Sequence, residues 1–353
     1  MKKVKLILVI VFCVLIPLIS CSSDSGDNSS NNKPSNLVVN TEIVGLTASL
    51  PNGDGSGVVN FIISADNATS YKLLIGTETI TSTSGIVSHT FNQSGTNTYT
   101  IYVSAYNGNE FISTTVNLTV YVTPSLVWSD EFNVNGSPDN TKWSYETGTG
   151  SGGWGNNELQ YYTNRPENVK VENGLLKITA IKENYSGSAY TSGRIVTKDK
   201  YSVKYGRIDI RAKLPIGGGT WPALWMLGNN ISSAGWPACG EIDIMEHVGN
   251  DLNRIHGTLH YPGHSGGNAD SSSILISNVS SEFHVYSIDW NASFIKFYVD
   301  NQLFYTFNNG GNLPFNQPFF FILNCAMGGN FGGSVDPNFV SSTLEVDYVR
   351  VYN

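Results

Sequence analysis

The sequence has few charged side chains, and this shortage narrows the class of protein. Charged residues make up 14% of the chain, against roughly 25% in an average soluble protein. Basic residues are the scarcer kind, with 20 Lys and Arg against 28 Asp and Glu and a net charge of −8. Such a chain repels phosphate backbones, so we expect no nucleic-acid partner. Because apolar residues make up 40% of the chain, wholesale disorder is excluded as well.

Glycine and aromatic residues, by contrast, are plentiful. The chain has 36 glycines, and aromatic residues make up 12% of it. This composition is typical of β-sandwiches with many turns and an aromatic-lined binding face. A length of 353 residues allows two or three domains. Beyond the N-terminus, the chain has no run of roughly 18 apolar residues that would span a membrane as a helix.

The N-terminus carries the pattern of a secretory signal. A basic start, Met1–Lys5, precedes an apolar run that ends in Leu18-Ile19-Ser20-Cys21. This ending resembles a bacterial lipobox, in which the cysteine is acylated; a plain signal peptide and a membrane anchor are the alternatives. We expect residues 1–20 to be removed, Cys21 to carry lipid that attaches the protein to a membrane, and residues 21–36 to form a flexible tether. The expected location is the cell envelope, at the outer membrane and exposed on the surface.

The chain has only four cysteines. Cys13 lies in the predicted signal and Cys21 in the lipobox. Cys239 and Cys325 remain in an exported and therefore disulfide-permissive setting. The sequence leaves open whether these two pair or stay as buried thiols. Their spacing offers no metal-binding motif.

Residues 37–123 predict a small domain of short β-strands. Turn clusters separate about seven strand-like runs, which indicates an Ig-like sandwich. The region resembles PKD-like modules, although their Gly-Asp-Gly turn is altered here at Gly76-Thr77-Glu78. We expect a spacer, with a carbohydrate-binding module as the alternative. The runs include Val58–Ser64, Tyr71–Ile75, Tyr99–Tyr106 and Ile112–Val122.

From residue 126 to residue 353 the pattern stays rich in β-strands. Residues 207–212 alternate strictly between polar and apolar side chains. The runs Ile295–Asp300 and Gln302–Phe307 bracket Asp300-Asn301, which predicts a β-hairpin. Thr123-Pro124-Ser125 marks the expected domain boundary. We expect residues 126–353 to form one large all-β sandwich or jelly roll.

One segment of this domain alternates acids with apolar residues: Gly240-Glu241-Ile242-Asp243-Ile244-Met245-Glu246-His247. Side chains at even spacing share one face of a strand, so Glu241 and Asp243 point one way and Ile242 the other. Glu246 lies five positions from Glu241 and has the wrong parity. One extra residue in a β-bulge, most simply at Ile244-Met245, corrects the phase. The sequence therefore predicts a bulge that brings Glu246 onto the acidic face.

Three like charges on one face are costly unless they face water or share protons. A solvated strand edge and a calcium site are therefore alternatives. The apolar opposite face and the nearby indoles of Trp221, Trp225 and Trp236 favour the floor of a sugar-binding cleft. Retaining glycoside hydrolysis needs two carboxyls about 5–5.5 Å apart. A third carboxyl between them tunes their protonation.

The acidic motif resembles the E-x-D-x-x-E signature of glycoside hydrolase family 16, in its laminarinase-like branch. That resemblance implies a concanavalin-like β-jelly-roll of two curved sheets with an open groove. It covers about residues 126–353 and continues in the same order through several blocks. These blocks are Trp128–Phe132, Trp154–Tyr162, Tyr190–Arg194, Gly219–Met226, Gly257–Tyr261, Phe283–Tyr286, Asp289-Trp290, Leu323-Asn324, Gly328-Gly329 and Val346–Tyr352.

The resemblance implies a role for each acid. Glu241 is the nucleophile, Asp243 its helper and Glu246 the general acid/base. It also implies stacking of Trp221, Trp225 and Trp236 on glucose rings before the cleaved bond, although core packing is the alternative for each indole. Three further positions match residues that contact sugar or face the cleft in the family, with ordinary structural contacts as the alternative: Asn156, Arg194 and His260.

The resemblance also implies a calcium ion on the convex face, away from the cleft, where many family members hold one. The matching positions are Glu131, the backbone carbonyl of Gly174, and Asp347, which are hard oxygen ligands of the kind that Ca²⁺ prefers. We expect a structural Ca²⁺ there, with solvated strand-end acids as the alternative. No cofactor is expected for catalysis.

The sequence therefore predicts a monomeric, surface-attached endo-glycosidase that cleaves laminarin-type β-1,3-glucan with retention. A mixed-linkage β-1,3-1,4-glucanase is the nearest alternative; the extra residue in the acidic motif favours β-1,3. Enzymes for sulfated polysaccharides fit less well, because few basic residues lie near the motif. A non-catalytic glycan-binding lipoprotein is the alternative from another class. Retention of three crowded acids favours the enzyme over that binder.

Overall fold

The computed structural model describes residues 32–353. The predicted signal at 1–20, Cys21 and the first part of the predicted tether lie outside the described residues. Within the described part, no helix is long and apolar enough to cross a membrane. The chain divides into two compact units. The first contains β3, β4 and most of β1, β2, β6 and β7, and the second contains β8–β24 with the remaining ends of the earlier strands.

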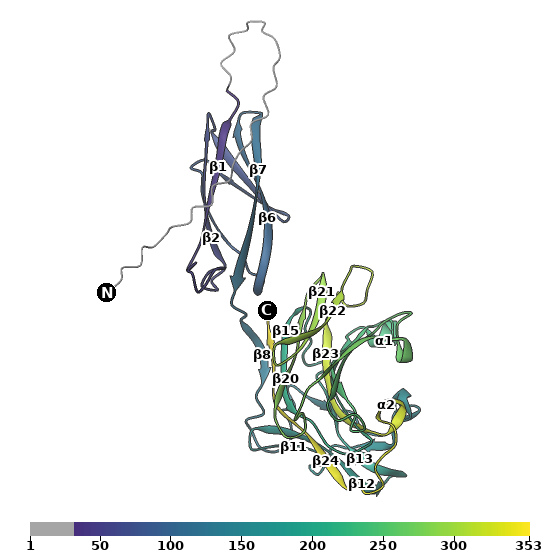
Figure 1. Cartoon of the computed structure of the whole chain (residues 1–353). Coiled ribbons are helices and arrows are strands. Elements are labelled where there is room, and N and C mark those ends of the chain that lie inside the picture. Colours follow the sequence, from purple (N-terminus) through teal and green to yellow (C-terminus); the bar gives the residue numbers. More distant parts are fainter. Residues whose placement is uncertain (1–31) are drawn as a thin grey trace, which may run out of the picture. The chain divides into compact units, whose positions relative to one another are not determined.

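The expected β-strands are present in the N-terminal part. Seven strands form a sheet of order β1-β2-β5 and a sheet of order β4-β3-β6-β7 (Figure 1). The four runs named from the sequence fall within β2, β3, β6 and β7. The Ig-like or PKD-like assignment and the boundary at 123–125 stay predictions. The strands are β1 (Ser35–Ile43), β2 (Val58–Asp66), β3 (Ser70–Ile75), β4 (Glu78–Ser82), β5 (Ile86–Thr90), β6 (Gly95–Asn107) and β7 (Glu110–Val122).

The C-terminal part contains two larger sheets. One has ten strands: β8 (Leu126–Asp130), β10 (Gln160–Tyr162), β11 (Val169–Glu172), β12 (Leu175–Tyr185), β13 (Ser188–Ser192), β15 (Gly206–Lys213), β20 (His284–Trp290), β21 (Phe294–Val299), β22 (Gln302–Asn308) and β24 (Ser341–Tyr352). The other has seven: β9 (Ser144–Tyr145), β14 (Arg194–Val196), β16 (Thr220–Gly228), β17 (Glu241–His247), β18 (Arg254–His260), β19 (Asp270–Leu275) and β23 (Phe319–Met327). The prediction of a β-jelly-roll is confirmed.

Short turns complete this unit. They are the helical turns α1 (Ile231–Ala234) and α2 (Gly329–Gly332) and the irregular turns η1 (Gly153–Asn157) and η2 (Gly266–Asn268). In Figure 1, α1 and α2 face each other on the open side of this curved unit. The acidic strand β17 lies inside the seven-stranded sheet, in the order β19-β18-β17-β16-β23-β14-β9.

The core lies between these two sheets, and strand alternation determines what reaches it. In β16, Leu224 and Met226 enter the core, whereas Trp221 and Trp225 project from the other face. Strand β23 is buried on both faces, and its Phe321, Leu323 and Cys325 belong to the same core. The opposite face of the seven-stranded sheet is therefore free to carry a site.

Three smaller predictions can be compared with the structure. Strand β15 alternates between partly exposed and buried residues over 207–212, as expected. Strands β21 and β22 form the predicted hairpin, and both turn residues, Asp300 and Asn301, have positive φ, which Asp and Asn tolerate best after glycine. Cys239 and Cys325 are free and fully buried. The two cysteines are therefore buried thiols, and burial raises the pKa of each.

The predicted bulge is present in β17. Asp243 pairs with Thr258 and Glu246 with His256, so Ile244 and Met245 together oppose the single residue Gly257. Both Ile244 and Met245 enter the core, which returns Glu246 to the face of the other acids. Because Gly257 faces the same core, a Cβ atom there would lie 2.8 Å from Cδ1 of Phe297.

Gly257→Ala is expected to destabilise the protein. The Phe297 ring is fully buried and has no room to move, and overpacking of this kind costs about 1–3 kcal/mol. The thermal midpoint should fall by about 2–4 °C for each kcal/mol, measured by calorimetry. Gly310→Ala is the matched control, because a Cβ there meets nothing within 4 Å. Equal midpoints for the two variants would contradict tight packing behind the bulge.

Candidate active site

The three acids of β17 line one cavity. Glu241, Asp243 and Glu246 border a space of about 250 Å³ on the face of the sheet opposite the core. Strands β14, β16, β18 and β23 supply the rest of its floor. The bulge therefore places the first and last acids of the motif in the same cleft. This is the arrangement that a pair of catalytic carboxyls requires.

Each outer acid receives a hydrogen bond from a different indole. Nε1 of Trp236 donates to Oε2 of Glu241 over 2.7 Å. Nε1 of Trp221 donates to Oε1 of Glu246 over 3.0 Å, and the hydroxyl of Thr258 donates to its Oε2 over 3.2 Å. An indole N–H can only donate, so each contact stabilises the ionised form of its carboxyl.

Burial raises the pKa of all three carboxyls. Burial and the adjacent Asp243 carboxylate raise the pKa of Glu241 to about 8, against the opposing effects of His260 and Trp236. Burial and the Glu246 charge raise the pKa of Asp243 well above its usual range. Burial also raises the pKa of Glu246, although the Trp221 hydrogen bond opposes it. Since three neighbouring carboxylates do not all ionise at such a site, the cluster shares protons and titrates as a unit.

His260 faces the same acids from β18. Its Nε2 lies 3.3 Å from Oδ2 of Asp243 and 3.8 Å from Oε1 of Glu241. The backbone N–H of Gly266 donates to its Nδ1 over 3.1 Å, which places the hydrogen of the neutral ring on Nε2. The ring therefore presents a donor to the acids. His260 thus lines the cavity of the three acids, and a contact with sugar stays a prediction.

The three predicted tryptophans do not gather in one place. Trp225 and Trp236 line the cavity of the three acids, and Trp236 is 50% exposed. Trp221 instead lines an adjoining cavity of about 470 Å³ and is only 9% exposed. Glu246 borders both spaces. A single stacking platform made of all three indoles therefore does not describe this site.

Arg194 and Asn156 also line the acid-containing cavity. The Arg194 guanidinium carbon lies 4.4 Å from the ring centre of Trp154 and 4.9 Å from that of Trp225, and Nε donates to Glu146 over 2.6 Å. Arg194 is thus held between two indoles and stiffens the cleft wall. Asn156 borders both cavities. Direct contact of either side chain with sugar stays a prediction.

A partly buried chain of hydrogen bonds holds Trp225, and the sequence did not reveal it. Trp225 Nε1 donates to Asn324 over 2.7 Å, Asn324 Nδ2 donates to the Tyr162 hydroxyl over 3.0 Å, and Tyr162 donates to Glu158 over 3.0 Å. Gln160 donates to the same Glu158 oxygen over 2.6 Å. All five of these residues lie in blocks that carry the family resemblance. Their places in those blocks marked these residues in the sequence. The hydrogen bonds between them could not be predicted, because the fold brings them together from distant segments.

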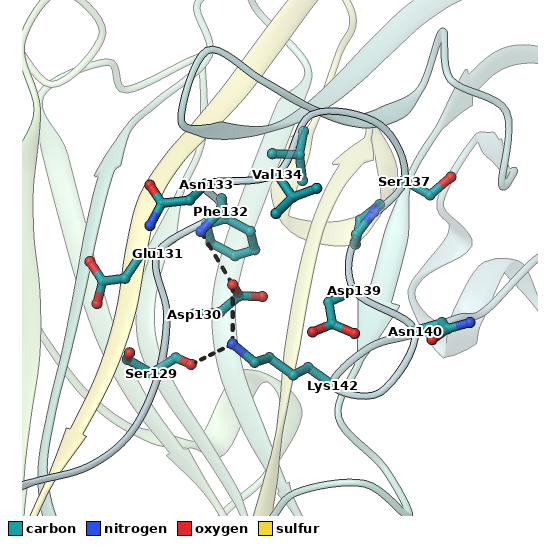
Figure 2. A pocket seen from close by; sticks show the side chains of 12 residues that line it. Ser129, Asp130, Glu131, Phe132, Asn133, Val134, Ser137, Asp139, Asn140 and Lys142 are labelled. Atoms are coloured by element: carbon teal, nitrogen blue, oxygen red, sulfur yellow. Dashed lines mark hydrogen bonds and ion pairs between the residues drawn. The ribbon is translucent and has the colours of Figure 1, made fainter.

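Two of the three predicted calcium ligands, Glu131 and Asp347, already have cationic partners. Both oxygens of Glu131 accept from Arg350, at 2.9 and 2.8 Å, and Asp347 accepts from Arg211 at 2.5 Å. In Figure 2 the Glu131 carboxylate points away from Asp130 and Lys142. Residues 129–134 and 137–140, with Lys142 and Val171, line the cavity of about 560 Å³ drawn there. The acids as placed are bonded to arginines and do not form a cage for an ion.

Within residues 32–353, one group of His, Cys, Asp or Glu side chains could hold a metal ion. It consists of Glu241, Asp243 and His260, whose ligand atoms lie within 4.8 Å of one another. These are the acids and the histidine of the cleft. The raised pKa values of Glu241 and Asp243, and the contacts of both carboxyls with His260, fit proton sharing within the cleft.

A curved β-sandwich with paired carboxyls and indoles in its cleft is the architecture of a glycoside-cleaving hydrolase. The sequence matches the model of the glycosyl hydrolases family 16 over residues 156–350. The chain therefore belongs to glycosyl hydrolase family 16.

Named relatives agree with this assignment. A beta-glucanase of Rhodothermus marinus is 49% identical over 243 residues, covering 64% of this chain and 84% of that protein. A glucan endo-1,3-beta-glucosidase A1 of Niallia circulans is 43% identical over 257 residues, covering 65% of this chain and 38% of that protein. The X-ray structure of the Rhodothermus marinus laminarinase is similar with a TM-score of 0.62 and 48% identity, covering 65% of this chain and 97% of that one.

The two indole donors generate predictions for different limbs of the pH profile. Trp221→Phe removes a donor that lowers the pKa of Glu246, so the alkaline limb of kcat/KM should move up by about one pH unit. Trp236→Phe removes a donor that lowers the pKa of Glu241, so the acidic limb should move up instead. Each variant is the control for the other, since both lose one indole N–H. Movement of the same limb in both variants would contradict the separate roles.

Proposed function

We propose that this chain is a retaining endo-glycosidase that hydrolyses β-1,3-glucan of the laminarin type. The observation that carries the proposal is the β17 bulge, which brings Glu246 into the cleft that holds Glu241. The similarity to a glucan endo-1,3-beta-glucosidase and to a laminarinase supports the substrate. A mixed-linkage β-1,3-1,4-glucanase remains the alternative substrate assignment.

The reaction follows from the placement of the two acids. Glu246 gives its proton to the glycosidic oxygen while the Glu241 carboxylate attacks the anomeric carbon; the carbon–oxygen bond breaks and the leaving sugar departs with the proton. Water then attacks the same carbon, Glu246 takes a proton from it, and the ester to Glu241 breaks. Two inversions leave the configuration unchanged. Asp243 and His260 act on the pKa of Glu241 in opposite directions: the Asp243 charge raises it, and His260 lowers it. Together they tune the protonation of the nucleophile between the two steps.

Replacing either outer acid should abolish turnover without disturbing the fold. Glu241→Gln and Glu246→Gln are each expected to lower kcat on laminarin by at least about 10³-fold, because neither amide attacks carbon or transfers the proton. Melting curves check the fold, and a binding assay with laminarin checks the cleft. Near-normal turnover in either purified variant would refute the assignment and favour a glycan-binding protein.

Substrate choice is tested by reducing-sugar release from laminarin, lichenan and agarose with the full chain. We expect the highest kcat/KM on laminarin. Comparable or faster release from lichenan would support the mixed-linkage alternative, and release from agarose alone would overturn both glucan assignments.

The location is a separate proposal. A basic start, an apolar run and the ending Ile19-Ser20-Cys21 support a surface lipoprotein anchored through Cys21, with residues 37–123 as a spacer and a single copy as the working form. Metabolic labelling with a fatty acid should mark the wild-type protein, and Cys21→Ala should lose both the label and the membrane fraction. Label retained in that variant would overturn the anchor.

The structural Ca²⁺ also stays a proposal, opposed by the arginine partners of Glu131 and Asp347. A melting midpoint that falls with EDTA and returns with Ca²⁺ would support the ion, whereas an unchanged midpoint would count against it.

A further inference from the structure

The four-stranded sheet of the first compact unit, β4-β3-β6-β7, exposes aromatic rings on one face (Figure 1). In β6, every second residue from Ile101 to Ala105 is fully buried. Because neighbouring side chains of a strand point to opposite faces, Tyr102 and Tyr106 point away from that core. Tyr102 is 55% exposed. The outward side chains of these four strands within residues 70–117 are called the outer face below.

The rings form two apolar spots on the outer face. Tyr106 contacts Phe111 of the neighbouring strand β7, with ring centres 5.4 Å apart and planes inclined by 30°. Phe111 is 52% exposed. Tyr102 lies opposite Leu74 of β3, which is 36% exposed. Since a strand rises about 3.3 Å per residue, the two spots lie about 13 Å apart along β6. A ligand that contacts both must therefore be extended.

Short polar side chains lie between and beside these spots. The hydroxyls of Ser104 and Ser113 pair across β6 and β7 over 2.8 Å, and Thr100 donates to Asn117 over 2.7 Å. A hydroxyl has one donor and two acceptor sites, so each pair keeps capacity for a further hydrogen bond. Sugar hydroxyls have the same mixed character and can use that capacity.

Charge selects among the ligands that such a face could bind. Within residues 70–117, Lys72 is the only charged side chain among the outward positions of the four strands. A nucleic acid, an acidic lipid surface or a sulfated polysaccharide requires a cluster of basic residues. A neutral ligand rich in hydroxyls requires none, and the outer face suits that class.

The size of the apolar patch favours an oligosaccharide over a protein partner. A stable protein interface buries roughly 800 Å² of each partner and takes roughly 20–30 residues a side. The large apolar side chains of the outer face are only Leu74, Tyr102, Tyr106 and Phe111. Hydroxyl and amide side chains surround them. A patch of this size is small for a second copy of the chain, but sufficient for stacking against a few sugar rings.

The rings of the outer face are in position before any ligand binds. Strand β6 is paired on both sides, with β3 and β7. Tyr and Phe have only two side-chain torsions, so ordering them on binding costs little entropy. A rigid, flat sheet with fixed rings is suited to an extended chain, which needs no enclosing pocket.

We propose that the outer face binds a neutral, extended β-glucan chain, apart from the catalytic cleft. Tyr102 and the Tyr106–Phe111 pair contact the C–H faces of sugar rings. The hydroxyls of Ser104 and Ser113 pair with sugar hydroxyls between them. The choice of β-glucan rests on the proposed glycosidase function, whereas the presence of a glycan-binding face does not. Binding there raises the effective concentration of polymeric substrate near the linked catalytic domain.

Retention on insoluble β-1,3-glucan tests the outer face. Every sample is the full chain with Glu241→Gln, so that the glucan is not degraded. Tyr102→Ala and Phe111→Ala should each raise the Kd for the glucan about tenfold, because each removes a ring that contacts sugar. With Glu241 restored, both variants should keep kcat/KM on laminaritetraose within about twofold, since that short substrate reacts in the cleft alone.

Two control variants separate ring contacts from general stickiness. Tyr102→Phe keeps the ring and should keep the Kd within about threefold. Ile62→Ala removes a side chain that is 50% exposed on β2, in the other sheet, and should leave the Kd unchanged. If Ile62→Ala loses as much retention as Tyr102→Ala, adsorption is unspecific and the inference fails. It fails too if neither Tyr102→Ala nor Phe111→Ala changes retention, and the glycosidase is then untouched.

Two outcomes distinguish this inference from its neighbours. Analytical ultracentrifugation checks for a second copy on the outer face, and a dimer that Phe111→Ala dissociates would overturn the inference. A chain with native Glu241 that releases no sugar from laminarin would overturn the proposed glycosidase function. Retention that both alanine substitutions still weaken would, in that case, keep the glycan-binding face.

Discussion

The site depends on one irregularity in the backbone of β17. In a regular strand Glu246 would point into the core beside Phe297, where an ionised carboxyl has no partner and costs several kcal/mol. The extra residue sends Ile244 and Met245 inward together and lets Glu246 emerge in the cleft. Gly257, opposite the bulge, leaves room for the rings of Phe297 and Phe304, which a Cβ atom would approach to 2.8 and 3.1 Å. Core packing and catalytic geometry are therefore satisfied by the same local distortion.

Given this geometry, the neighbouring side chains determine how the protonation of Glu241 differs from that of Glu246. Glu241 and Glu246 are chemically identical side chains within one strand, yet one is bonded to Trp236 and lies near His260, while the other is bonded to Trp221 and Thr258. Asp243 between them is 3% exposed and cannot ionise independently. A cluster that holds fewer than three charges keeps one carboxyl ready to attack and another ready to donate a proton. Separate partners, rather than residue type, assign those two tasks.

Features that depend on strand periodicity could be predicted from the sequence. The parity of Glu241 and Glu246 required a bulge, and Asp300-Asn301 required a hairpin; both are present. Features that depend on contacts between distant segments could not be predicted from the sequence. Trp221 lines the cavity of about 470 Å³ together with Phe331, whose ring contacts it although the two residues are 110 positions apart in the chain. No local sequence pattern predicts that contact. Likewise, strand alternation puts His256 and Thr258 on the same face as His260, but only the register with β17 shows that His256 lies opposite Glu246.

The chemistry and the sugar contacts lie on different kinds of elements. The acids lie on a strand paired on both sides, so their positions are fixed by two hydrogen-bonded ladders. Trp236 and Phe331 instead lie on connections, after α1 and within α2, which are free to vary without disturbing either ladder. Changes in those connections would alter which sugars fit on each side of the cleaved bond while leaving the reaction itself intact. The preference for one glucan over another should therefore depend on these two short turns more than on the strands that carry the acids.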